Sequence, residues 1–110
     1  MSDRDQICRD FQTAVNMTAT ELAAWLETDE SRRVGWKDGD PTRESIGHAS
    51  GRRIVVLLRT PVAALRDDDY AHMRKVVGFC RRHLAQRPEN DVTSRWRYSL
   101  MNWGHDPLKY

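Results

Sequence analysis

The sequence predicts an all-α fold, a compact single-domain bundle of four or five helices. Apolar residues in the stretch Asp67 to Leu84 recur every three or four positions, which is the period of an amphipathic helix. Thr18 and Glu21 stand three residues apart before an apolar run, which is the signature of a helix capping box. The one apolar run that would suit a strand, Ile54 to Leu58, has no second strand to pair with.

Length and charge limit the number of domains and the kinds of partner that the sequence predicts. The 110 residues suffice for one domain, residues 1–110, and not for two. The 18 Lys and Arg nearly balance the 16 Asp and Glu, and a net charge of +2 does not by itself predict a nucleic-acid or membrane partner. No window has the roughly 20 apolar residues of a membrane span, and residues 1–10 do not resemble a signal peptide. We therefore expect a cytoplasmic protein with no membrane partner.

Two helices and one extra turn are predicted before residue 35. The first covers residues 4–15, where apolar side chains recur at helical spacing. The second begins at Thr18, where Met17 and Leu22 form the hydrophobic staple of the capping box, and it ends near Thr28. Residues 29–34 add one further turn.

A polar loop and a third main helix follow. Residues 35–50 are rich in glycine, and loops of this length are often functional, although a simple solvated connection is an equal alternative. We expect a helix from Ser50 to Thr60, with Ser50 as its N-cap and Pro61 as the breaker after it. Arg52 and Arg53 would then occupy its first turn, where cations oppose the helix dipole and call for a bound anion.

The central helix is predicted at residues 67–87. Asp67, Asp68 and Asp69 suit its N-terminus, and Pro88 follows its end. A last helix runs from residue 92 or 93 to 103 and stops at Gly104, and the tail 105–110 is expected to fold back onto the domain. The predicted core comprises Trp25, Ile54, Leu57, Leu58, Met73, Val77, Leu84, Trp96, Leu100 and Trp103.

The sequence contains no pattern typical of catalysis. There is no GxSxG elbow and no glycine-rich phosphate loop. Cys80 and His83 are three residues apart, but with His72 they do not give the spacing of a tetrahedral metal site. Cys8 and Cys80 form no CxxC pair, which fits reduced thiols. We therefore expect a non-catalytic protein without a cofactor or a metal.

DNA is the partner that the charge pattern favours. Beside its apolar arc, the central helix carries a basic strip, and the helix before it contributes two further arginines. If both helices pack as neighbours, their guanidinium groups share one surface, and guanidinium matches phosphate oxygens bidentately. No Asn or Gln joins the strip, so we expect contacts to the backbone rather than to bases. The alternative is that these arginines pair with acidic residues. The candidate nucleic-acid-binding residues are His48, Arg52, Arg53, Arg74, Lys75, Arg81 and Arg82.

The last helix suggests a second kind of site. Its sequence mixes aromatic and basic side chains, and exposed Arg, Tyr and Met give large contact area for little entropy loss. The expected alternative function is therefore a surface for protein interaction or homodimer formation. Ordinary packing of a C-terminal helix is the competing explanation of this pattern. The residues assigned to it are Arg95, Arg97, Tyr98, Met101 and Asn102.

Four segments carry a resemblance that covers nearly the whole chain. They are AVNMTATELAAWLETDES at 14–31, GHASGRRIVVLLR at 47–59, DDDYAHMRKVVGFCRRHLAQRP at 67–88 and RWRYSLMNWGHDPLK at 95–109. With them the chain resembles a family of small, mainly actinobacterial proteins classed as a domain of unknown function. Its members are often labelled DNA-binding protein. The resemblance implies a family and hardly any chemistry; its label modestly favours association with DNA and supplies no binding residues.

Overall fold

The computed structural model describes residues 3–35, 43–88 and 95–109, and within these ranges the chain is all-α, as predicted. The described part contains no strand. Its elements are α1 (Asp3–Ala14), α2 (Ala19–Leu26), α3 (Asp29–Arg33), α4 (Ile46–Leu58), the 3-10 turn η1 (Val62–Ala64), α5 (Asp67–Leu84) and α6 (Arg95–Asn102).

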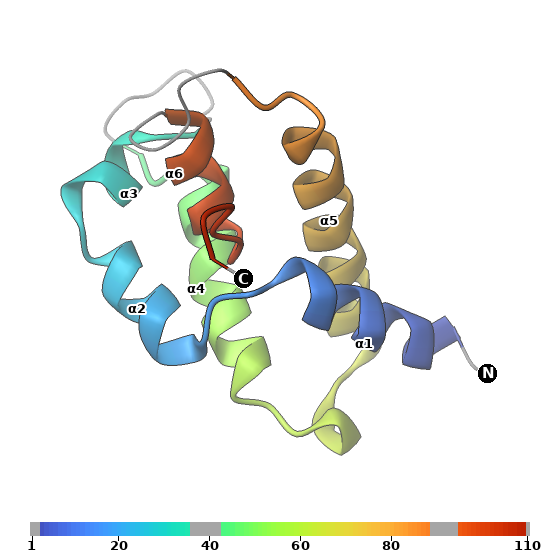
Figure 1. Ribbon diagram of the computed structural model, residues 1–110. Helices are drawn as coiled ribbons and strands as arrows, with labels where there is room; N and C mark the ends of the chain where they lie inside the picture. Colours follow the sequence, from blue (N-terminus) through green and yellow to red (C-terminus); the bar gives the residue numbers. More distant parts are fainter. Residues whose placement is uncertain (1–2, 36–42, 89–94, 110) are drawn as a thin grey trace.

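The helices form two packed pairs joined through α6 (Figure 1). One pair is α1 with α5, where α1 crosses the lower half of α5, and the other is α2 with α4. The chain turns through η1 so that α4 and α5 run antiparallel (Figure 1). Because α6 contacts α2, α3, α4 and α5, the C-terminal helix holds the two pairs together.

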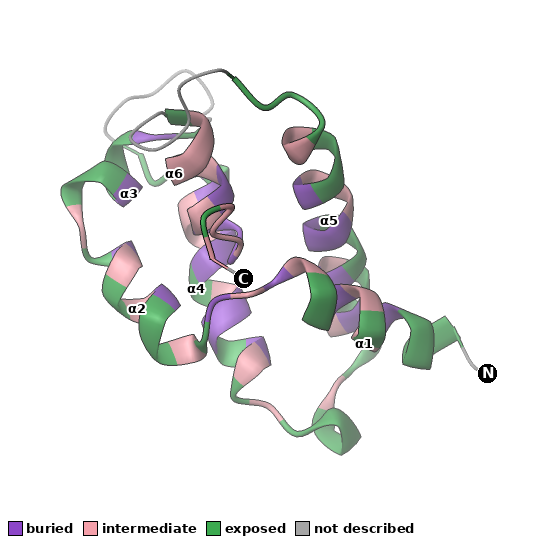
Figure 2. Ribbon diagram, viewed as in Figure 1, coloured by how far each residue is buried: buried purple, intermediate pink, exposed green. Residues whose placement is uncertain are grey.

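The buried residues line the inner faces of all the longer helices (Figure 2). Most of the predicted core is confirmed, and the remainder is half-buried and packed against it. The buried members are Ile54, Leu57, Met73, Val77, Leu100 and Trp103, and the half-buried ones are Trp25, Leu58, Leu84 and Trp96. The sixth helix, beyond the four or five expected, is the five-residue α3. It forms because Thr28 caps a new helix start, accepting from the Ser31 N–H at 3.2 Å.

The capping box of α2 is confirmed. The Glu21 N–H donates to the Thr18 hydroxyl at 3.1 Å, and the Thr18 N–H donates to the Glu21 carboxylate at 2.8 Å. Met17 and Leu22 are both buried, as expected of the flanking staple.

The start of α4 was predicted wrongly. The helix begins at Ile46, capped by the fully buried Ser45, whose hydroxyl accepts from the His48 N–H at 3.0 Å. The polar loop predicted at 35–50 therefore ends at residue 45, and of that loop residues 36–42 lie outside the described part. Arg52 and Arg53 stand in the helix interior, where they do not oppose the dipole of its first turn.

Gly47 and Gly51 explain this error, because they lie inside α4 and allow it to pack closely against α6, and they do not end the helix. A Cβ at Gly47 would lie 2.9 Å from Trp103 Nε1, and one at Gly51 would lie 2.5 Å from the Asn102 carbonyl oxygen. These positions are bare so that α4 can approach α6.

The central helix and the C-terminus agree more closely with expectation. α5 spans Asp67–Leu84, three residues short of the predicted end at 87. Gly104 follows α6 with φ +84°, the left-handed conformation that ends a helix. The predicted start of α6 at 92 or 93 lies outside the described residues.

The tail folds back through polar contacts. His105 Nδ1 lies 2.6 Å from the Ala14 carbonyl, and the Asp106 N–H donates to the Asn16 side chain at 2.8 Å. Leu108 remains 39% exposed, so it does not anchor the tail. Tyr110, at the end of the tail, lies outside the described residues.

Candidate nucleic-acid interface

The outer side of α5 carries a cluster of cations that we call the α5 basic face, made of Arg74, Lys75, Arg81 and Arg82. All four residues are exposed. Their spacing of one, seven and eight positions gathers them on one side of a helix. The opposite side of α5 is buried in the core through Tyr70, Met73, Val76, Val77 and Cys80.

Three of these cations have no carboxylate partner in the described part of the chain. Within the described ranges, no carboxylate oxygen lies within 4.0 Å of the charged nitrogens of Arg74, Lys75 or Arg82. Arg81 lies 3.5 Å from Asp10, and its side chain is still 68% exposed. An exposed pair of this length contributes little and exchanges easily with an external anion.

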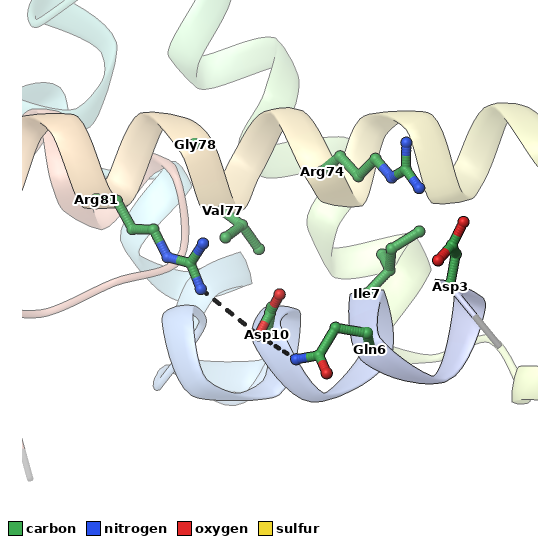
Figure 3. Close-up of a pocket in the computed structure, with 8 residues that line it drawn as sticks. All are labelled: Asp3, Gln6, Ile7, Asp10, Arg74, Val77, Gly78 and Arg81. Carbon is green, nitrogen blue, oxygen red and sulfur yellow. Dashed lines mark hydrogen bonds and ion pairs between the residues drawn. The ribbon is translucent and has the colours of Figure 1, made fainter. Parts of the chain in front are cut away.

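A groove between α1 and α5 lies at one edge of this face (Figure 3). It encloses about 290 Å³, and Ile7, Val77 and Gly78 form its apolar lining. Arg74 and Arg81 reach toward it from α5, and acidic residues of α1, Asp3 and Asp10, face them (Figure 3). Because the groove has both charges, a phosphate is better placed on the outer, solvent-facing side of α5.

The two arginines of α4 do not extend the basic face. Arg52 pairs with both carboxylate oxygens of Glu44, through Nε at 2.7 Å and through Nη2. This hydrogen bond, together with a contact to His48, lowers the pKa of Glu44 to about 2. Arg53 lies 3.5 Å from Asp69 and 3.8 Å from Asp68, because the antiparallel arrangement places it beside the acidic start of α5.

His48 is also removed from the predicted surface. Its Nε2 lies 2.8 Å from the Leu26 carbonyl oxygen, its Nδ1 contacts Glu44, and its side chain is only 12% exposed. The ring thus links α4 to the end of α2. The prediction that an anion binds at a helix N-terminus formed by Gly51 to Arg53 is wrong, because those residues lie inside α4.

The residues assigned to a C-terminal interaction surface are largely used inside the molecule. Asn102, predicted to face outward, is 1% exposed and is a correction to that set. Tyr98 packs on Trp25 with ring centroids 5.3 Å apart, and Arg97 pairs with Asp106 at 3.2 Å. Met101 is half-buried against the core, and Arg95 is exposed. A role for this surface in binding stays a prediction.

Sequence reasoning missed a stack of rings beside the basic face. Neighbouring rings lie between 4.4 and 6.3 Å apart with interplanar angles of 12° to 18°. Burial lowers the pKa of His83 and, more strongly, that of His72, to about 4. The spacing of seven and four between the three α5 members is the signal that could have revealed it. In order the rings are His72, Trp103, Phe79, His83 and Trp96.

These features define an all-α protein whose central helix exposes the side chains of Arg74, Lys75, Arg81 and Arg82. The chain matches the family model described as "Protein of unknown function (DUF3140)" over residues 10–101, and it belongs to that family. No curated protein and no solved structure matches the chain. None of the helices in the described segments is long and apolar enough to cross a membrane.

Proposed function

We propose that this protein associates with DNA by contacting backbone phosphates through the α5 basic face. The observation that carries the proposal is that Arg74, Lys75 and Arg82 share one exposed side of a rigid helix without a carboxylate neighbour in the described residues. Cations already held by carboxylates must break those pairs before they bind phosphate, and these three do not.

The shape and composition of the face favour backbone contacts over base recognition. Ala71 and Gly78 lie on the same side of α5 and carry little or no side chain, so a phosphate backbone can approach closely. The face contains no Asn or Gln, the residues that read adenine bidentately. Arginine and lysine contacts to phosphates position a protein on the duplex and carry no sequence information. The proposed association is therefore independent of sequence.

The test is a titration of fluorescein-labelled duplex DNA, followed by anisotropy at several salt concentrations. Four phosphate contacts release counterions and give a slope of log affinity against log salt of about −3.6. Affinity should then fall roughly 100-fold between about 50 and 200 mM salt. Two duplexes of unrelated sequence should bind equally.

Single substitutions locate the contact. Arg74→Ala should weaken binding and make the salt slope shallower by about 0.9, the loss of one phosphate contact. Arg52→Ala is the matched control, because it also removes one exposed arginine, but one that Glu44 already holds. It should leave both the affinity and the slope unchanged.

Two outcomes would end the proposal. One is the absence of binding at the lowest salt concentration. The other is an equal loss of affinity in the Arg52 and Arg74 variants, which would point to net charge rather than to a defined face. Circular dichroism of each variant checks that the fold is retained.

A further inference from the structure

A second pocket lies at the junction of α4, α5 and α6, away from the groove against α1. It encloses about 310 Å³, and Ile46, Gly47, Phe79 and Trp103 contribute its mostly apolar walls. Two exposed cations, Lys75 and Arg82, also line it. No acidic side chain of the described residues does so. Small-molecule sites have this combination of an apolar enclosure and a few polar groups, and volumes of about 300 Å³ and upward.

The indole N–H of Trp103 has no hydrogen-bond acceptor among the residues that the structure describes. The residue is 4% exposed, and buried Trp N–H groups normally find a partner. The other tryptophans described obey this rule, since Trp25 donates to Asn102 at 2.8 Å and Trp96 donates to the His83 carbonyl at 2.7 Å. Trp103 Nε1 has no such partner among the described residues, and it is not sealed from solvent.

The position of this N–H directs it to the pocket. Nε1 packs against the first turn of α4, since it would lie 2.9 Å from a Cβ at Gly47. Gly47 and Trp103 both line the pocket. The unused donor therefore opens onto the same space as the two cations.

The first turn of α4 adds to the positive character of this space. Ser45 accepts from the His48 and Ala49 N–H groups, and the Ile46 and Gly47 N–H groups have no acceptor in the described part of the chain. Unpaired N–H groups at the start of a thirteen-residue helix favour an anion. Donors and cations thus line the same space, and no carboxylate of the described residues lines it with them.

We infer that this pocket binds a small carboxylate with an apolar body. The carboxylate accepts the indole N–H of Trp103 and is neutralised by Lys75 and Arg82. The apolar body lies against Phe79, whose ring stacks on Trp103 at 4.4 Å, and against Ile46, which is 47% exposed. At the ~30 Å³ that one water molecule occupies in the liquid, the volume corresponds to roughly ten water-sized groups. This inference does not rest on DNA binding.

The probe is phenylacetate, titrated into the full-length ¹⁵N-labelled protein and followed by the indole N–H signals in ¹⁵N–¹H spectra. The Trp103 signal should shift saturably, and more than the signals of Trp25 and Trp96, whose donors are already paired. Its assignment comes from Trp103→Phe, which removes the signal while keeping an aromatic ring in the stack. The same variant should weaken phenylacetate binding about tenfold, measured by calorimetry.

Charge dependence gives the second readout. Phenylacetamide has nearly the same shape without the charge, and it should bind at least about tenfold more weakly than phenylacetate. Arg82→Ala should reduce phenylacetate affinity about five- to tenfold. Arg74→Ala is the matched control, because Arg74 belongs to the α5 basic face and does not line this pocket.

The results separate this inference from the proposed DNA association. Arg74→Ala should weaken DNA and leave phenylacetate binding unchanged, whereas Trp103→Phe should do the reverse. The inference is overturned if phenylacetate at about 10 mM leaves the Trp103 signal in place. It is equally overturned if the amide binds as well as the acid, or if Arg82→Ala has no effect on phenylacetate affinity.

Discussion

Asn102 connects three helices through one buried side chain. Its Oδ1 accepts the Trp25 indole N–H of α2 and the Ser31 hydroxyl of α3, and its Nδ2 donates to the Ser31 carbonyl at 3.0 Å. Asn102 and Ser31 are both almost completely buried. A polar cluster of this kind is stabilising only when every member is satisfied, so each partner depends on the carboxamide.

We expect Asn102→Ala to lower the free energy of unfolding by about 2 to 4 kcal/mol, because it removes the acceptor of the half-buried Trp25 indole N–H and of the fully buried Ser31 hydroxyl. Urea denaturation measures the loss. Arg95→Ala, an exposed position on the same helix, is the control and should change stability by less than about 0.5 kcal/mol. A loss below about 1 kcal/mol for Asn102→Ala would show that water replaces the carboxamide.

At the scale of the elements, glycines with different surroundings have opposite effects on stability. Gly104 ends α6 with φ +84°, and a Cβ there would lie 2.9 Å from Val15 Cγ1. Gly78 lies inside α5, where a Cβ would meet only the flexible end of Arg82, at 3.0 Å from Nη1. Position 104 therefore requires glycine, whereas nothing in the surroundings of position 78 requires it.

Gly104→Ala should therefore destabilise the protein by about 2 kcal/mol or more, through left-handed strain and displacement of Val15. Gly78→Ala should stabilise it by about 0.5 to 1 kcal/mol, because alanine favours a helix interior. Thermal melts of the two variants beside the wild type measure both signs. A destabilised Gly78→Ala would mean that Arg82 cannot move aside.

Helix starts differ in how far they can be read from local sequence. The capping box of α2 and the start of α5 follow from residues within a few positions, so both were predicted correctly. The start of α4 was not, because Gly47 and Gly51 look like loop residues until their contacts with Trp103 and Asn102 on α6 are known. Those partners lie more than 50 positions away.

At the scale of the whole molecule, contacts between helices make the fold sensitive to acid. Burial, with smaller contributions from Arg53 and Lys75, lowers the pKa of His72 to about 4 from an ordinary value near 6.5. Between about pH 4 and pH 6.5 the imidazole of His72 is therefore protonated in the unfolded chain and neutral in the folded protein. Stability should therefore be complete above about pH 6.5 and fall as the pH drops toward 4.

Glu44 acts in a lower window with a different cause. Its pairing with Arg52 lowers its pKa from 4.5 to about 2, so its contribution is present above pH 4.5 and is lost as the pH falls toward 2. Urea denaturation across the pH range tests both groups. His72→Gln should reduce the pH dependence of stability between about pH 4 and 6.5, and Glu44→Gln should reduce it between about pH 2 and 4.5. Unchanged pH profiles in both variants would contradict these assignments.

The amino-acid order alone specifies the helical class, the capping box, the course of α5 and most of the core, because helix period and capping depend on neighbours within one or two turns. The roles of the charged and polar side chains depend on distant partners. Packing pairs Arg52 and Arg53 with carboxylates, leaves Arg74, Lys75 and Arg82 without one in the described residues, and buries Asn102. The pairing of Arg53 with Asp69 and the burial of Asn102 arise between different helices, so only their assembly could assign them.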